Sequence, residues 1–269
     1  MREHSLRVAV LLVLVSLPAL PSAALTAREI LDRAKALEDG ERKWDDRTQR
    51  MTLQAVDAGG DQRQRQIQVF TKRVTPDEEK TLSFLLAPPE VRGTGFLQWS
   101  HRGRDDEQCL YLPEFRRTRQ IAARVKDESF VGTDFSYRDL EIVGKILRWT
   151  EAEGPSALGN DETVAGRLCY GIEIQPKQDG TPYKKIVLNL DRERLVARKL
   201  AFFDGSGSNV KVLTTDDLRD VGAIPTPYRI EMRNLKKGSH TVVTVDEVQF
   251  NTKLADDLFT QRHLERGAP

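Results

Sequence analysis

Apolar and polar residues alternate along most of the chain after residue 50, in short runs separated by turn sequences. In "YKKIVLNLD", Ile186, Leu188 and Leu190 share one face against polar neighbours. A period of two residues is typical of a β-strand with one buried and one solvated face. Similar runs recur up to residue 250, and "DAGGD", "DGSGS" and "KKGS" supply turn residues between them. The pattern predicts about eleven antiparallel strands in one curved sheet; "GKILRWT", residues 144–150, is read as one of them.

A different period marks residues 26–38, "TAREILDRAKALE". Thr26 with Glu29 three positions later is a capping box, and Ile30, Leu31 and Ala34 then recur at helical spacing. This predicts an N-terminal helix with one apolar stripe. Such a stripe has to be buried, so we expect the helix to cover the apolar side of the sheet.

The first 24 residues have the layout of a secretory signal. Arg2 and Arg7 precede the apolar run "VAVLLVLVSLPAL", and small residues follow at Ser22 and Ala24. We therefore expect residues 1–24 to be a cleaved signal peptide, residues 25–269 to form a single domain, and the mature protein to reside in the periplasm of a Gram-negative-type envelope. A formal net charge of +1 gives no support to general nucleic-acid binding. Cys109 and Cys169 can form a disulfide after export or remain two free thiols.

Motifs for catalysis or metal binding are not found in the sequence. The histidines downstream of the leader are isolated in polar surroundings, and neither a Gly-x-Ser-x-Gly elbow nor a His-x-x-x-His spacing is present. We expect no cofactor, no metal and no enzymatic activity. One enzymatic alternative stays open, in which Asp134 and Asp139 serve as acid and base of a hydrolase, which requires one of them to be desolvated.

The stretch "DESFVGTDFSYRDLE", residues 127–141, is better explained as a fastener of the fold. Phe130, Phe135 and Tyr137 can sink into the sheet, Gly132 permits a turn, and Asp134 or Ser136 can cap a short helical turn.

Just upstream, "RRTRQIAARVK" is rich in basic residues and has no acid. Either these cations pair with the acidic stretch that follows, or they form a basic rim that docks phosphate headgroups or a partner protein. The residues concerned are Arg116, Arg117, Arg119, Arg124 and Lys126.

Three blocks resemble, in order and spacing, the signature blocks of the LolA-like proteins known as outer membrane lipoprotein-sorting proteins. They are "LLAPPEVRGTGFLQWS", "DDEQCLYLPEFRRTRQI" and "SFVGTDFSYRDLE", which together span residues 85–141, and the ending "DDLFTQRHLE" is also similar. The positions that carry the resemblance are Arg92, Gly93, Gly95, Phe130, Gly132, Asp134, Phe135, Tyr137 and Asp139.

This resemblance implies an incomplete antiparallel β-barrel with short helical lid segments over an apolar cavity. It also implies a carrier that binds a lipid or lipoprotein acyl chain, with a resistance-nodulation-division type transporter as a partner, and we expect a monomer. Alternation alone assigns ten residues to the cavity lining, although each can equally be ordinary core. They are Leu53, Phe70, Leu82, Phe84, Phe96, Trp99, Leu112, Ile121, Leu188 and Leu190. The alternative function is a non-lipid interaction module that docks a transporter subunit.

Overall fold

The computed structural model describes residues 25–101, 104–177 and 181–267. The predicted signal peptide therefore lies outside the described residues. In chain order, the helices are α1 (Ala27–Asp39), α2 (Tyr137–Lys145) and α3 (Gln261–Arg266), with short 3-10 helices η1 (Pro89–Val91), η2 (Pro113–Phe115), η3 (Ala123–Val125), η4 (Ile146–Arg148) and η5 (Asp256–Phe259).

The strands follow the predicted hairpin pattern. They are β1 (Asp46–Val56), β2 (Gln62–Thr75), β3 (Glu78–Ala87), β4 (Gly95–Ser100), β5 (Glu107–Leu112), β6 (Arg117–Gln120), β7 (Ser156–Leu158), β8 (Glu162–Val164), β9 (Arg167–Ile174), β10 (Lys185–Asp191), β11 (Ala197–Phe203), β12 (Asn209–Val221), β13 (Ile224–Asn234) and β14 (Ser239–Phe250).

All the strands belong to one antiparallel sheet. The order across it is β6-β5-β4-β3-β2-β1-β14-β13-β12-β11-β10-β9-β7, and β8 pairs with β9. Neighbours in sequence are mostly neighbours in the sheet, and β1 closes the gap between the two halves by pairing with β14. Strands β6 and β7 are unpaired edges in the described part of the chain, so the curved sheet is a half-barrel. The prediction of a mainly β, incomplete antiparallel barrel is confirmed.

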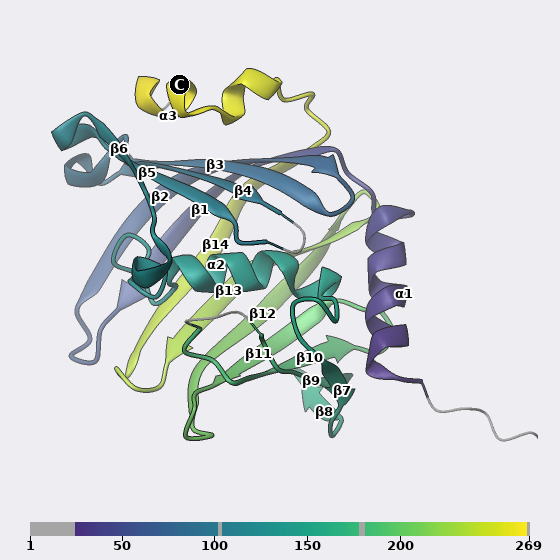
Figure 1. Ribbon diagram of the computed structural model, residues 1–269. Helices are drawn as coiled ribbons and strands as arrows, with labels where there is room; N and C mark the ends of the chain where they lie inside the picture. Colours follow the sequence, from purple (N-terminus) through teal and green to yellow (C-terminus); the bar gives the residue numbers. More distant parts are fainter. Residues whose placement is uncertain (1–24, 102–103, 178–180, 268–269) are drawn as a thin grey trace, which may run out of the picture.

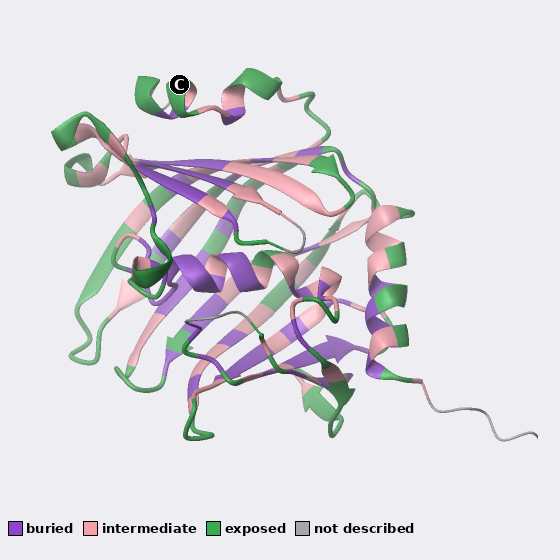
Figure 2. Cartoon of the chain, viewed as in Figure 1, coloured by how far each residue is buried: buried purple, intermediate pink, exposed green. Residues whose placement is uncertain are grey.

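The sheet wraps around α2, which lies in its concave side, while α3 lies against the convex side of β4, β5 and β6, and η5 lies against β3 (Figure 1). Helix α1 runs along the open flank, beside η4 and β7. Its capping box is present as predicted, since Thr26 accepts a hydrogen bond from the backbone N–H of Glu29 and Glu29 accepts one from that of Thr26. Helix α2 is buried over most of its length, whereas α1 exposes one face (Figure 2).

Two apolar clusters lie on opposite faces of the sheet. The inner cluster, on the concave face, contains Leu53, Phe96, Leu188 and Ile30 of α1. The outer cluster joins residues of β3, β4 and β5 to the C-terminal segment through Phe259 and Leu264, both fully buried. Adjacent residues of one strand, such as Phe84 and Leu85, enter different clusters because successive side chains point to opposite faces.

The prediction of a strand at residues 144–150 is wrong. Residues 144–145 end α2, and Ile146–Arg148 continue it as η4. Ile142, Ile146 and Trp149 are all buried in the inner cluster, and their spacing of four and three residues is that of a helix. Among the described residues, no helix is long and apolar enough to cross a membrane.

Candidate functional site

The concave face of the sheet is filled by residues 127–149, which we call the inner segment. Ser136 caps α2, since its hydroxyl accepts a hydrogen bond from the Asp139 N–H at 3.1 Å, and Asp139 accepts one from the Ser136 N–H at 2.7 Å. The local prediction that this stretch caps a short helix is confirmed. Because the cap fixes where α2 starts, it also fixes which side chains face the sheet.

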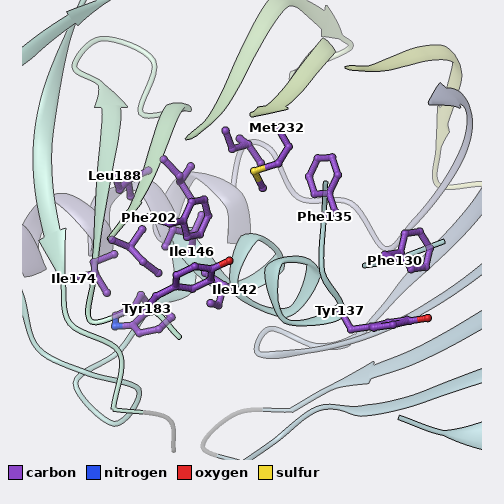
Figure 3. Packing of buried hydrophobic residues seen from close by; sticks show 14 of the residues in the cluster. Phe130, Phe135, Tyr137, Ile142, Ile146, Ile174, Tyr183, Leu188, Phe202 and Met232 are labelled. Atoms are coloured by element: carbon purple, nitrogen blue, oxygen red, sulfur yellow. The ribbon is translucent and has the colours of Figure 1, made fainter. Parts of the chain in front are cut away.

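Aromatic rings of the inner segment pack against the strands. Phe130 lies 5.3 Å from Phe96 and 5.7 Å from Tyr137 between ring centroids, both in edge-to-face geometry. Figure 3 shows Phe130 and Tyr137 with Phe135 and Met232 in the inner cluster, and Ile142 and Ile146 of the inner segment beside Tyr183 and Phe202. The apolar interior expected from the sequence is present and is occupied by the chain itself.

Asp134 and Asp139 tie the inner segment to the opposite half of the sheet. Asp134 accepts hydrogen bonds from the hydroxyl groups of Ser239 and Thr241 on β14, and its own N–H donates to Thr241 Oγ1 at 2.9 Å. Asp139 is fully buried, accepts from Tyr183 Oη at 2.7 Å and pairs with Lys211 Nζ at 2.6 Å.

Every oxygen of these two carboxylates is engaged in such contacts. Burial, and to a smaller extent the charge of Asp139, raises the pKa of Tyr183. The Tyr183 hydroxyl therefore stays protonated and donates its hydrogen bond to Asp139. Both aspartates therefore act as anchors of the inner segment.

A second group of buried charges lies at the other side of α2. The side chains of Glu141 and Lys126 are each 3% exposed, and Lys126 Nζ lies 3.1 Å from Glu141 Oε2. Lys145 Nζ lies 2.6 Å from Asp106 Oδ1. Burial raises the pKa of Asp106, and the nearby Glu141 adds to this rise although the Lys145 ammonium opposes it. These ion pairs connect α2 to the residue that precedes β5 and to the residue that follows η3.

Two small hollows lie beside α2. One has a volume of about 180 Å³ and is lined mainly by charged side chains, with Trp149 and Ile142 as apolar contributions. Another, of about 30 Å³, lies near His101 and Arg148. Pockets for small organic ligands usually measure about 300–1,000 Å³. Neither of these two hollows is large enough for a long acyl chain.

The ten residues assigned to the cavity lining by alternation divide between the two clusters. The inner cluster or its partly buried contacts contain Leu53, Phe96, Leu112, Ile121, Leu188 and Leu190. The outer cluster or its contacts contain Phe70, Leu82, Phe84 and Trp99. Trp99 also donates from Nε1 to the Phe259 carbonyl at 3.3 Å. Alternation does not tell which face is concave, because both faces are covered by apolar groups. Phe96 and Trp99, three residues apart on β4, point to opposite faces and so cannot line the same cavity.

The predicted basic rim is exposed at four of its five positions. Arg116, Arg117, Arg119 and Arg124 are solvent-exposed on η2, edge strand β6 and η3. Lys126 is buried and pairs with Glu141, so it belongs to the ion pairs under α2 and not to the exposed rim.

The glycines of the resemblance occupy positions where a side chain is excluded. A Cβ at Gly95 would lie 2.6 Å from Leu264 Cδ1 of α3, and Gly93 has a φ of +80°. Gly132 has a φ of +74° and faces the guanidinium of Arg65. Arg92 is exposed, and its Nε donates to the Leu86 carbonyl at 2.9 Å.

Sequence reasoning did not find the partners of the two anchors. Tyr183, Lys211, Ser239 and Thr241 are far from the inner segment in sequence, so no local signal connects them to it. It also missed Arg65. The one feature of the sequence that points to this residue is a positive charge at a strand position whose side chain faces the interior by alternation. Cys109 and Cys169 are free and buried.

Comparison with known proteins agrees with this architecture. A family model described as "Uncharacterized protein" matches residues 77–266. An outer membrane lipoprotein-sorting protein domain from Vibrio parahaemolyticus is similar in structure, with a TM-score of 0.81, 27% identity, and coverage of 88% of this chain and 97% of that one. No curated protein matches the sequence.

Two further structures share the fold at lower identity. A DUF1329 family protein from Desulfovibrio piger has a TM-score of 0.80 and 24% identity over 88% of this chain and 98% of that one. A LolA superfamily protein from Nitrosomonas europaea has a TM-score of 0.67 and 17% identity, and the match covers 89% of this chain and 100% of that one. The chain belongs to the family that the matching model describes, and its fold is that of the LolA-like outer membrane lipoprotein-sorting proteins.

Proposed function

We propose that this protein is a periplasmic carrier that binds an acyl chain of a lipid or lipoprotein and passes it from an inner-membrane transporter toward the outer membrane, without covalent chemistry. The observation that carries the proposal is an open half-barrel whose apolar concave face is covered by a separate segment and not by another layer of sheet. The likeness to a lipoprotein-sorting domain supports the same class of role.

The energetics explain why such a face is required. Each methylene shielded from water contributes about 0.8 kcal/mol, so a sixteen-carbon chain exposed to water costs about 12 kcal/mol. Only a continuous apolar surface can offset that cost. The strands of the half-barrel supply one, with Leu53, Phe96 and Leu188 among its residues.

Loading requires α2 and η4, the helical part of the inner segment, to move away from the sheet. Their polar attachments include those of Asp139, Glu141, Lys145 and Arg148, while their apolar contacts are of the same kind that an acyl chain would replace. An entering chain therefore compensates for the apolar contacts that the segment loses. The remaining cost is that of breaking these hydrogen bonds and ion pairs.

Native mass spectrometry of the protein purified from the periplasm tests the proposal. We expect mass peaks above that of the bare chain, which disappear after organic extraction and yield an acylated molecule in the extract. An exported protein of similar size without an apolar interior, purified in the same way, serves as the control. A preparation that is uniformly free of lipid, from a host that makes its natural cargo, contradicts the carrier role.

A second candidate is an interaction module whose interior stays packed and whose basic rim docks a transporter subunit. It is favoured by the small size of the hollows and by edge strand β6, which exposes Arg117 and Arg119 and follows Phe115, 66% exposed. Reversing the charge at Arg116, Arg117 and Arg119 separates the two functions. Lost transporter binding with unchanged lipid content favours docking alone.

A further inference from the structure

Arg65 is a half-buried cation for which the described part of the chain provides no acceptor. It lies on β2 opposite Leu53 of β1, and because directly opposed residues share a face, its side chain belongs to the concave side. Its Nε and Nη1 atoms are shielded from solvent and make no hydrogen bond, and the guanidinium forms no ion pair with a described residue. Buried polar groups are normally satisfied, so an arginine in this state calls for an explanation.

The surroundings of Arg65 are cationic. Burial lowers the pKa of Arg65, and the charge of Arg63, two residues along the same strand, lowers it further. Arg63 is exposed and lies two positions nearer the β1–β2 hairpin, so the two cations line one end of the concave face.

The loop opposite Arg65 also offers donors without acceptors. A Cβ on Gly132 would lie 3.1 Å from Arg65 Nη2, so the guanidinium rests against the backbone of this loop. The loop is fixed on both sides, since the Thr133 N–H donates to the Phe130 carbonyl and the Asp134 N–H donates to Thr241. The N–H groups of Val131 and Gly132, between these points, donate to no described residue.

The same loop is strained. Val131 has a φ of +44° and Gly132 a φ of +74°, and a β-branched residue in the left-handed region is an outlier. Strained backbone persists only where the surrounding structure holds it, and it is concentrated at ligand and switch sites. Here the strain coincides with unpaired amides and an unpaired guanidinium.

We propose that Arg65, Arg63 and the Val131–Gly132 turn form a binding site for the phosphate of an anionic amphiphile whose chain follows the concave face. The inference rests on the proposed carrier function and specifies the headgroup of its ligand. A guanidinium donates two parallel hydrogen bonds to one oxyanion, and the two free amides add donors for a further oxygen. An ester or amide headgroup cannot compensate the positive charge of two arginines.

Isothermal titration calorimetry of the purified chain tests this site. The probes are dodecyl phosphate and dodecyl maltoside, both below their micelle concentrations, and inorganic phosphate. We expect the native protein to bind dodecyl phosphate about tenfold more tightly than dodecyl maltoside, because hydrogen bonds between a guanidinium and a phosphate are stronger than those to an uncharged headgroup. Arg65→Gln should reduce this preference to less than about threefold, and Arg65→Lys should retain part of it, since the ammonium keeps the charge without the fork.

Arg50→Gln is the matched control, because Arg50 is an exposed arginine on the neighbouring strand that pairs with Glu247. It should leave the preference unchanged. Arg65→Gln should not lower the melting temperature, because the guanidinium makes no hydrogen bond that the substitution could remove. A clear loss of stability in Arg65→Gln indicates a structural role and overturns the site.

The remaining outcomes separate this inference from the carrier role. Equal binding of both alkyl probes to the native protein overturns the phosphate site and leaves the carrier function standing. Binding of neither alkyl probe overturns both. Displacement of dodecyl phosphate by inorganic phosphate at a similar concentration supports the oxyanion site but identifies its ligand as a free anion and not a lipid headgroup.

Discussion

The role of a single carboxylate in this protein depends on which residues face it across the sheet. Asp134 and Asp139 are in the same short stretch, and both are fully used as hydrogen-bond acceptors by residues of β12, β14 and the loop before β10. An acid or base in catalysis needs a free oxygen that can exchange a proton with a substrate. These two residues instead hold the inner segment in position.

Asp139→Asn should therefore destabilise the protein strongly. The substitution leaves Lys211, whose side chain is 14% exposed, beside a neutral amide, and breaking such a pair costs about 3 kcal/mol. Urea denaturation followed by circular dichroism measures the loss. Asp217→Asn, at an exposed aspartate paired with Arg219, is the control and should leave the midpoint unchanged. Coincident unfolding curves for Asp139→Asn and the native protein would contradict the anchoring role.

Asp191 gives a pH-dependent contribution to stability. Its burial favours the neutral form, but the N–H groups of Arg194 and Glu193 and the guanidinium groups of Arg167 and Arg198 outweigh this and hold its pKa below the ordinary value. A lowered folded-state pKa stabilises the fold above the unfolded-state pKa of about 3.9, and this contribution is lost as the pH falls toward the folded-state value.

The free-energy difference between the native protein and Asp191→Asn should thus be largest near pH 7 and shrink below about pH 4. Urea midpoints at a series of pH values measure it. A difference that stays constant down to pH 2 would mean that the Asp191 charge does not stabilise the fold.

For single residues, the sequence predicts contacts between near neighbours along the chain but not contacts between residues that are far apart in it. The cap from Ser136 to Asp139 spans three residues, and its residue types indicate it directly. The partners of the same Asp139 are Tyr183 and Lys211, and only the register of the completed sheet brings them there. The unpaired Arg65 could not be recognised either, because the lack of a partner is a property of the folded state.

Helices and strands could be predicted from the sequence where the pattern of apolar residues has one clear period. The helix at residues 27–39 and most hairpins agree with the structure, because capping boxes and turn residues are short-range signals. The segment at residues 144–150 was misread as a strand since its apolar residues fit both periods over so short a run. Extending the window back to Ile142 would have shown helical spacing with Ile146 and Trp149.

The C-terminal segment was not predictable as a cover for the convex face. Its last helix, α3, has only six residues, and Phe259 and Leu264 are its buried contacts to the sheet. Cys109 lies beneath this segment, and burial raises the pKa of its thiol, so it should be unreactive in the native protein.

Replacing Phe259 and Leu264 by alanine should release the segment and expose Cys109. Each substitution removes a fully buried side chain and costs about 2–5 kcal/mol, while the inner cluster keeps the sheet assembled. Reaction with a thiol reagent should rise from none to one equivalent per chain. Adding Cys109→Ser should abolish the reaction, because Cys169 is fully buried elsewhere. Unchanged reactivity in the double variant would contradict this packing.

For the whole molecule, the central feature is a single sheet with an apolar cluster on each face and two unpaired edges. A closed barrel would fix its interior volume, whereas open edges leave the concave side bounded, among the described residues, by α1 and the inner segment. The convex cluster is covered by the C-terminal segment, to which Lys72 is bonded through the Leu254 carbonyl and Asp256. The two faces therefore differ in which part of the chain an apolar guest would have to displace.

Hydrogen exchange with and without saturating dodecyl phosphate distinguishes the faces. An acyl chain on the concave side has to displace the inner segment, so amides of residues 127–149 that are protected in α2 should exchange at least about tenfold faster in the complex, as expected when local opening becomes easier by about 1.4 kcal/mol. Amides of α3 should not change, because the sheet separates α3 from the concave side. Faster exchange confined to α3 would place the acyl chain on the convex face, where Phe70, Leu82, Phe84 and Trp99 lie, and would reverse the assignment of the two clusters.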